Sequence, residues 1–111
     1  MMLTAAIIAL SVSTLGLAAV CENATFDELK SKLKGKGELN LVFFASWCIS
    51  CKPHLQAQHD SNVVFIAAFD EKPRAEKVLS SFGLTNPCFI GDDITNSLGI
   101  RGLPASKKIV F

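Results

Sequence analysis

The chain has 111 residues, which is enough for one small domain. Its net charge is +1, and it contains one Trp and no Tyr. Because no basic stripe and no interleaving of basic and aromatic residues is present, the composition argues against nucleic acid or another polyanion as a partner.

Residues 1–20 contain no charged residue and no proline, and small residues gather near their end. This pattern predicts a signal peptide or membrane anchor at 1–20, followed by a single domain at 22–111. Attachment of a lipid to Cys21 is a third interpretation, although Val20 is bulkier than that pattern expects. We therefore expect an extracytoplasmic domain, periplasmic or secreted, that touches a membrane only through its N-terminal segment.

The rest of the chain alternates between helical and strand patterns. Thr25 and Glu28 form a capping-box pattern at the start of the first predicted helix, and Gly83 is the predicted stop of the third. The alternation predicts an α/β fold with a central mixed sheet flanked by helices. Helices are predicted within 23–37, 48–59 and 73–82, strands at 39–45, 62–69, 88–90 and 109–111, and a turn at 99–104.

The motif Trp47-Cys48-Ile49-Ser50-Cys51-Lys52-Pro53 follows an apolar strand directly and opens a predicted helix. The N-terminus of a helix carries about half a positive charge, which favours thiolate over thiol. Two cysteines at this spacing can also close on each other. We expect Cys48 to be a partly exposed nucleophile and Cys51 to be the resolving thiol one turn deeper.

Together with Gly102-Leu103-Pro104 near the end of the chain, this motif resembles the thioredoxin-fold family. Within it the chain is similar to the extracytoplasmic thiol–disulfide oxidoreductases related to the reductases of cytochrome c maturation. The resemblance covers about 23–111 and implies a thioredoxin-like fold. It also implies a cis peptide bond before Pro104 and substrate-binding roles for Trp47, Leu103 and Pro104. No cofactor is implied.

The chain departs from the family pattern at the position of a buried acid, where Val42 stands instead. Asp70 or Glu71, with Glu71 preferred, is a candidate for the missing proton transfer; the alternative is a solvated loop. The C-terminal part is expected to be shortened, because only 105–111 follow the proline and the closing residues look like the family's last strand. The Ile49-Ser50 pair between the cysteines is not one of the familiar dipeptides.

Three functions stay open. The first is a reductase of protein disulfides that takes its electrons from a membrane partner. The second is a copper- or zinc-handling protein that uses Cys48 and Cys51, and the third is a degenerate thioredoxin-like domain used for binding. His54 extends the cysteine pair to a metal-like spacing, but one straight helix cannot surround an ion, so no metal site is predicted. Cys88 is expected to be buried and inert, with a disulfide to Cys21 as the alternative.

Overall fold

The computed structural model describes residues 18–111. The signal peptide or anchor predicted at 1–20 therefore lies, up to residue 17, outside the described residues. None of the helices within 18–111 is long and apolar enough to cross a membrane. The elements, in chain order, are β1 (Cys21–Asn23), α2 (Phe26–Leu33), β2 (Glu38–Phe44), α3 (Cys51–Gln56), β3 (Val63–Ala67), α4 (Lys72–Ser81), β4 (Cys88–Ile90), α5 (Asp92–Ser97) and β5 (Ala105–Val110).

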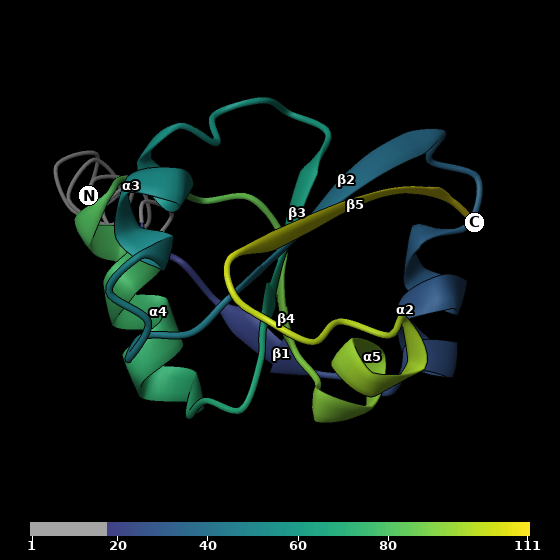
Figure 1. The fold of residues 1–111 in the computed structure, drawn as a ribbon. Coiled ribbons are helices and arrows are strands. Elements are labelled where there is room, and N and C mark those ends of the chain that lie inside the picture. The colour runs from purple at the N-terminus through teal and green to yellow at the C-terminus, as the bar shows by residue number, and fades with distance from the viewer. Residues whose placement is uncertain (1–17) are drawn as a thin grey trace, which may run out of the picture.

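The strands form one five-stranded sheet in the order β1-β4-β3-β2-β5 (Figure 1). Neighbours from β1 to β2 are parallel, whereas β5 runs antiparallel to β2. The predicted mixed sheet is therefore confirmed. Every residue of β3 is buried, as expected for a parallel strand that is covered on both faces.

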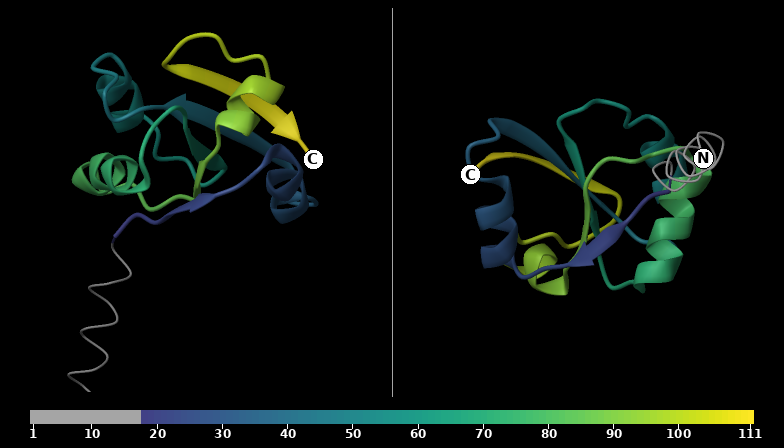
Figure 2. Two further views of the ribbon diagram at one scale, coloured as in Figure 1. Left: turned by 90° about the horizontal axis from the view of Figure 1, so that it is seen from below. Right: turned by 180° about the vertical axis from the view of Figure 1, so that it is seen from behind.

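The helices cover the two faces of the sheet in pairs (Figure 2). Leu55 of α3 and Leu79 of α4 belong to one core cluster, which also contains both ring systems of the edge-to-face pair Phe44–Phe65. Leu29 of α2 and Ile94 of α5 belong to the second cluster. The Cys48–Cys51 motif lies on the face covered by α3 and α4, since both cysteines belong to the first cluster.

Helix α3 is shorter at both ends than the helix predicted over 48–59. It begins at Cys51, and the residues before it form turns. Pro53 explains this start: it falls in the first helical turn, where its missing N–H is not needed. In a helix that began at Cys48, the backbone nitrogen of Pro53 would have to donate to the carbonyl of Ile49, and proline has no N–H with which to do so.

Strand β5 corrects the prediction for the C-terminus. It runs from Ala105 to Val110, directly after Pro104, rather than being a later strand limited to 109–111. The prediction is wrong because Lys107 and Lys108 interrupt the apolar pattern at an edge position, where charged side chains are common. Within the described part of the chain, β5 pairs with β2 alone.

Two short elements have no clear sequence signal. Strand β1 contains the exposed Glu22 and Asn23, and it pairs with β4. Helix α5 is polar apart from the buried Ile94, and the Thr95 hydroxyl donates to the carbonyl of Gly91 at 2.9 Å. Packing against the sheet, rather than local propensity, therefore determines these elements.

Candidate active site

Two consecutive turns connect β2 to α3 and place the cysteines. The backbone N–H of Cys48 donates to the carbonyl of Ala45 at 3.1 Å, which closes the first turn. The N–H of Cys51 donates to the carbonyl of Cys48 at 3.2 Å, which closes the second. Cys48 is therefore the last residue of one turn and the first of the next, and α3 begins where the second turn ends.

Cys48 and Cys51 form a disulfide in this structure. Cys51 is fully buried, and Cys48 is 7% exposed. Cys48 is therefore mostly buried, and the prediction that it is partly exposed is wrong. The Cys48 sulfur lies 3.6 Å from the hydroxyl oxygen of Ser50, close enough for a weak hydrogen bond.

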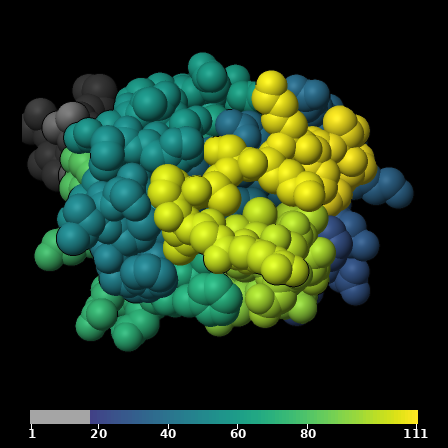
Figure 3. Space-filling view, in the orientation of Figure 1, coloured from purple at the N-terminus to yellow at the C-terminus, as the bar shows by residue number. Residues whose placement is uncertain are grey.

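A largely apolar groove of about 620 Å³ opens beside the disulfide. Trp47, Ile49 and Phe69 line it and are exposed by 59%, 82% and 54% of their surface, which is unusual for large apolar side chains. Figure 3 shows the segment leading to β5, in yellow, against the blue-green segment that contains α3. The full lining is Trp47, Cys48, Ile49, Ser50, Phe69, Thr95, Ile100, Arg101, Gly102 and Leu103.

The loop before β5 meets the disulfide across this groove. Leu103 lines the groove together with Cys48, although they are far apart in the sequence. The peptide bond between Leu103 and Pro104 is cis, as the resemblance implies. Pro104 itself is not among the lining residues. The structure thus brings together Trp47, Cys48 and Leu103.

The loop after β3 contacts the first of the two turns. The indole Nε1 of Trp47 donates to the carbonyl of Phe69 at 3.0 Å. Phe69 has a φ of 53°, in the left-handed region, and its own N–H donates to Asp92 Oδ1 at 2.8 Å. Sequence reasoning misses Phe69 and Asp92, because no local pattern marks either residue as part of this site.

The two candidate acids occupy different surroundings. The carboxylate of Asp70 accepts hydrogen bonds from Ser46, the residue before Trp47. Glu71 is exposed and occupies the N-cap position of α4 without a side-chain capping bond. Neither residue is among those that line the groove. Val42 is fully buried, so the strand before the motif is apolar at that position.

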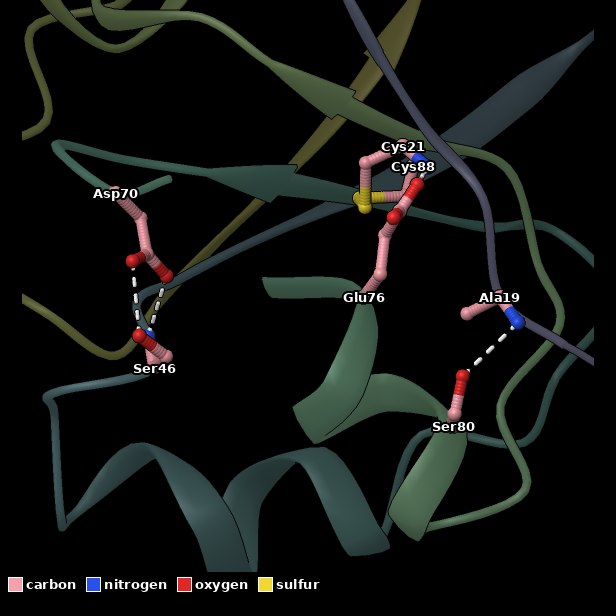
Figure 4. The surroundings of a disulfide bond; sticks show 7 residues. All are labelled: Ala19, Cys21, Ser46, Asp70, Glu76, Ser80 and Cys88. Carbon is pink, nitrogen blue, oxygen red and sulfur yellow. Dashed lines mark hydrogen bonds between the residues drawn. A yellow bond between two sulfur atoms is a disulfide. The ribbon is translucent and has the colours of Figure 1, made fainter. Parts of the chain in front are cut away.

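A second disulfide joins Cys21 of β1 to Cys88 of β4 (Figure 4). Both residues are buried, and the N–H of Cys21 donates to Glu76 Oε2 at 2.7 Å. The predicted burial of Cys88 is confirmed, and the disulfide is the pairing that the sequence left open. Because the Cys21 sulfur is bonded to Cys88, the interpretation that Cys21 carries a lipid is wrong. Ala19, just before, is buried, and its N–H donates to the Ser80 hydroxyl at 3.0 Å.

His54, the third residue of the metal-like spacing, is occupied elsewhere. Its Nε2 lies 3.1 Å from the hydroxyl oxygen of Ser106 in β5. Among residues 18–111, no group of three or more His, Cys, Asp or Glu side chains is arranged to hold a metal ion.

Three solved structures have the same fold. A secreted disulfide oxidoreductase of Mycobacterium tuberculosis, homologous to E. coli DsbE, is 19% identical over 86% of this chain and 78% of its own, with a TM-score of 0.62. DsbF of the same organism is 21% identical over 85% and 78%, with a TM-score of 0.58. The N-terminal domain of PilB from N. meningitidis is 22% identical over 87% and 77%, with a TM-score of 0.51. No protein-family model and no curated protein matches the chain.

These likenesses establish that the chain has a thioredoxin-like fold, which it shares with the secreted disulfide oxidoreductase above. Within that fold, the Cys48–Cys51 disulfide lies where β2 passes into α3. The resemblance seen in the sequence implies both this fold and this position of the cysteine pair.

Proposed function

We propose that the protein is a thiol–disulfide oxidoreductase that acts on protein disulfides through Cys48 and Cys51. The observation that carries this proposal is a Cys-x-x-Cys disulfide that opens at one side onto an apolar groove. The two cysteines differ in access, because Cys48 lines the groove whereas Cys51 is fully buried. This difference supports attack on a substrate by Cys48 and resolution by Cys51.

In the reducing direction, the Cys48 thiolate attacks one sulfur of the substrate disulfide. A mixed disulfide forms, and the other substrate sulfur leaves as a thiolate that takes up a proton. The Cys51 thiolate then attacks the Cys48 sulfur, which closes the Cys48–Cys51 disulfide and releases the second substrate thiol. Two electrons pass from the protein to the substrate. The Ser50 hydroxyl, 3.6 Å from the Cys48 sulfur, can donate to the thiolate and so favour it.

The groove supplies the substrate-binding surface in this proposal. Trp47 and Leu103 line it with Cys48 and present apolar surface to an extended substrate segment. Pro104 ends the loop that carries Leu103 to the groove. Proton transfer by Asp70 or Glu71 stays a prediction.

We infer that the protein reduces its substrates and works outside the cytoplasm. The apolar segment at 1–20 and the two disulfides support an oxidising compartment. The absence of a histidine between Cys48 and Cys51 supports the reducing direction, because a histidine there stabilises the thiolate in strong oxidants of this fold. A reductase in that compartment needs an electron donor from the membrane.

Turnover of a protein disulfide such as insulin tests the proposal. We expect activity in the wild type, none in Cys48→Ser, and a trapped mixed disulfide in Cys51→Ser. A reduction potential near about −270 mV supports the reducing direction, and one near about −120 mV supports an oxidant. Wild-type turnover by Cys48→Ser would contradict the proposal. A chain that retains about one copper or zinc ion through dialysis and shows no turnover would favour metal handling instead.

A further inference from the structure

A single carboxylate binds both hydrogen-bond donors of the residue before Trp47. Asp70 Oδ2 accepts from the backbone N–H of Ser46 at 2.6 Å, and Asp70 Oδ1 accepts from the Ser46 hydroxyl at 2.8 Å (Figure 4). Oδ1 also accepts from the N–H of Glu71 at 2.8 Å. Hydrogen bonds to an ionised acceptor are about twice as strong as neutral ones. The loop after β3 is thereby fastened to the turn that follows β2.

Ser46 lies inside the turn that ends at Cys48. The Ala45–Cys48 turn is closed by the bond from the Cys48 N–H to the Ala45 carbonyl, and Ser46 is its second residue. Cys48 is also the first residue of the turn that ends at Cys51. A shift of Ser46 therefore moves Cys48 relative to Cys51.

The loop that carries Asp70 is itself held in place. Phe69 has the left-handed backbone described above, which a non-glycine residue keeps only where its surroundings hold it. Its N–H is bound by Asp92 and its carbonyl by the indole of Trp47. Residues 69 and 70 thus contact both central residues of the Ala45–Cys48 turn, from a loop anchored to α5.

We propose that Asp70 is a positioning residue that holds the Ala45–Cys48 turn and so sets Cys48 at the distance from Cys51 that disulfide closure requires. The inference rests on the proposed function only in taking Cys48 and Cys51 as the redox pair. By restricting the turn, Asp70 raises the effective concentration of one thiol near the other. It therefore stabilises the disulfide relative to the dithiol, without contact with substrate.

Substitution of Asp70 by asparagine tests the hydrogen bonds of the carboxylate while the shape of the side chain is kept. Asn has the same outline but only one acceptor oxygen. Its side-chain NH2, which cannot accept, must therefore face the backbone N–H of Ser46 or that of Glu71. Asp93→Asn is the matched control. Asp93, like Asp70, has a carboxylate that accepts from a backbone N–H: the donor is Phe26, at 2.8 Å. Its substitution removes the same charge, but at the start of α2 rather than at the Ala45–Cys48 turn.

The test is the equilibrium between the reduced protein and glutathione disulfide, followed by mass spectrometry of the peptide that contains Cys48 and Cys51. Each closure converts the protein dithiol and one glutathione disulfide into the protein disulfide and two glutathione thiols. We expect Asp70→Asn to lower the equilibrium constant for closure about tenfold, which corresponds to a reduction potential about 30 mV higher. Ser46→Ala, which loses one of the two bonds, should change it in the same direction by about threefold, and Asp93→Asn should stay within about twofold of wild type.

A role in general stability alone would lower the melting temperature of both redox forms equally and leave this constant unchanged. An unchanged constant in Asp70→Asn, or an equal change in Asp93→Asn, would therefore overturn the inference. If Asp70→Asn does not fold, Ser46→Ala decides: a constant equal to that of wild type overturns the proposal. The measurement requires no protein substrate, so a wild type that closes its disulfide but does not turn over insulin would sink the proposed function and leave this inference standing.

Discussion

Removal of the Cys21–Cys88 disulfide should destabilise the protein much more than removal of Cys48–Cys51. The two bonds span sequence separations of 67 and 3 residues. A cross-link restricts the unfolded chain, and this restriction grows with the logarithm of the loop length. At 25 °C, these separations give about 4.4 kcal/mol for Cys21–Cys88 and about 1.6 kcal/mol for Cys48–Cys51 in the free energy of unfolding.

The assay compares two double variants, Cys21→Ala with Cys88→Ala and Cys48→Ala with Cys51→Ala. Both pairs are buried and both change to the same side chain, so each variant serves as the control for the other. Unfolding in urea without reductant, followed by far-ultraviolet circular dichroism, measures the two losses. For a domain of this size, the loss of Cys21–Cys88 corresponds to a melting temperature about 20 °C lower.

Equal losses in the two double variants would refute this reasoning. A loss below about 2 kcal/mol for the Cys21–Cys88 pair would do so as well, since the chain-restriction relation requires about twice that value. In either case, residual structure in the unfolded chain would have to bring β1 and β4 together without the bond.

Two further outcomes are expected. Gly91→Ala should destabilise the protein by about 1–3 kcal/mol in chemical unfolding, because the added Cβ would lie 2.5 Å from Ile94 Cδ1. The control is Gly102→Ala, whose Cβ meets nothing within 4 Å. Equal free energies of unfolding for the two variants would contradict this packing around Gly91. Trp47→Ala removes one wall of the groove and the hydrogen bond to the Phe69 carbonyl, so kcat/KM for insulin reduction should fall at least about tenfold. An unchanged kcat/KM would exclude this side chain from substrate binding.

Local chemistry made several elements predictable from the sequence. The capping box of α2 is present as expected: the Glu28 N–H donates to Thr25 Oγ1 at 3.2 Å, and Glu28 Oε1 accepts from the Thr25 N–H at 2.9 Å. Gly83 has a φ of 68° at the end of α4, the left-handed conformation that favours glycine. Such signals depend on residues a few positions apart, so they survive without knowledge of the fold.

The boundaries of α3 and β5 were harder to predict, for physical reasons. The start of α3 depends on where the missing N–H of Pro53 is least costly, and the two turns before it displace the helix by one turn. The identity of β5 depends on pairing with β2, since Lys107 and Lys108 leave no apolar run to mark an edge strand.

The sequence by itself identified the candidate redox pair, because Trp47, Cys48 and Cys51 lie within five residues of one another. Only the tertiary structure decided what surrounds that pair. Leu103 reaches Cys48 through the sheet topology, Asp70 meets Ser46 from 24 residues away, and Cys21 closes on Cys88 from 67 residues away. Contacts between distant residues follow from how strands and helices pack, and no local pattern of side chains encodes them.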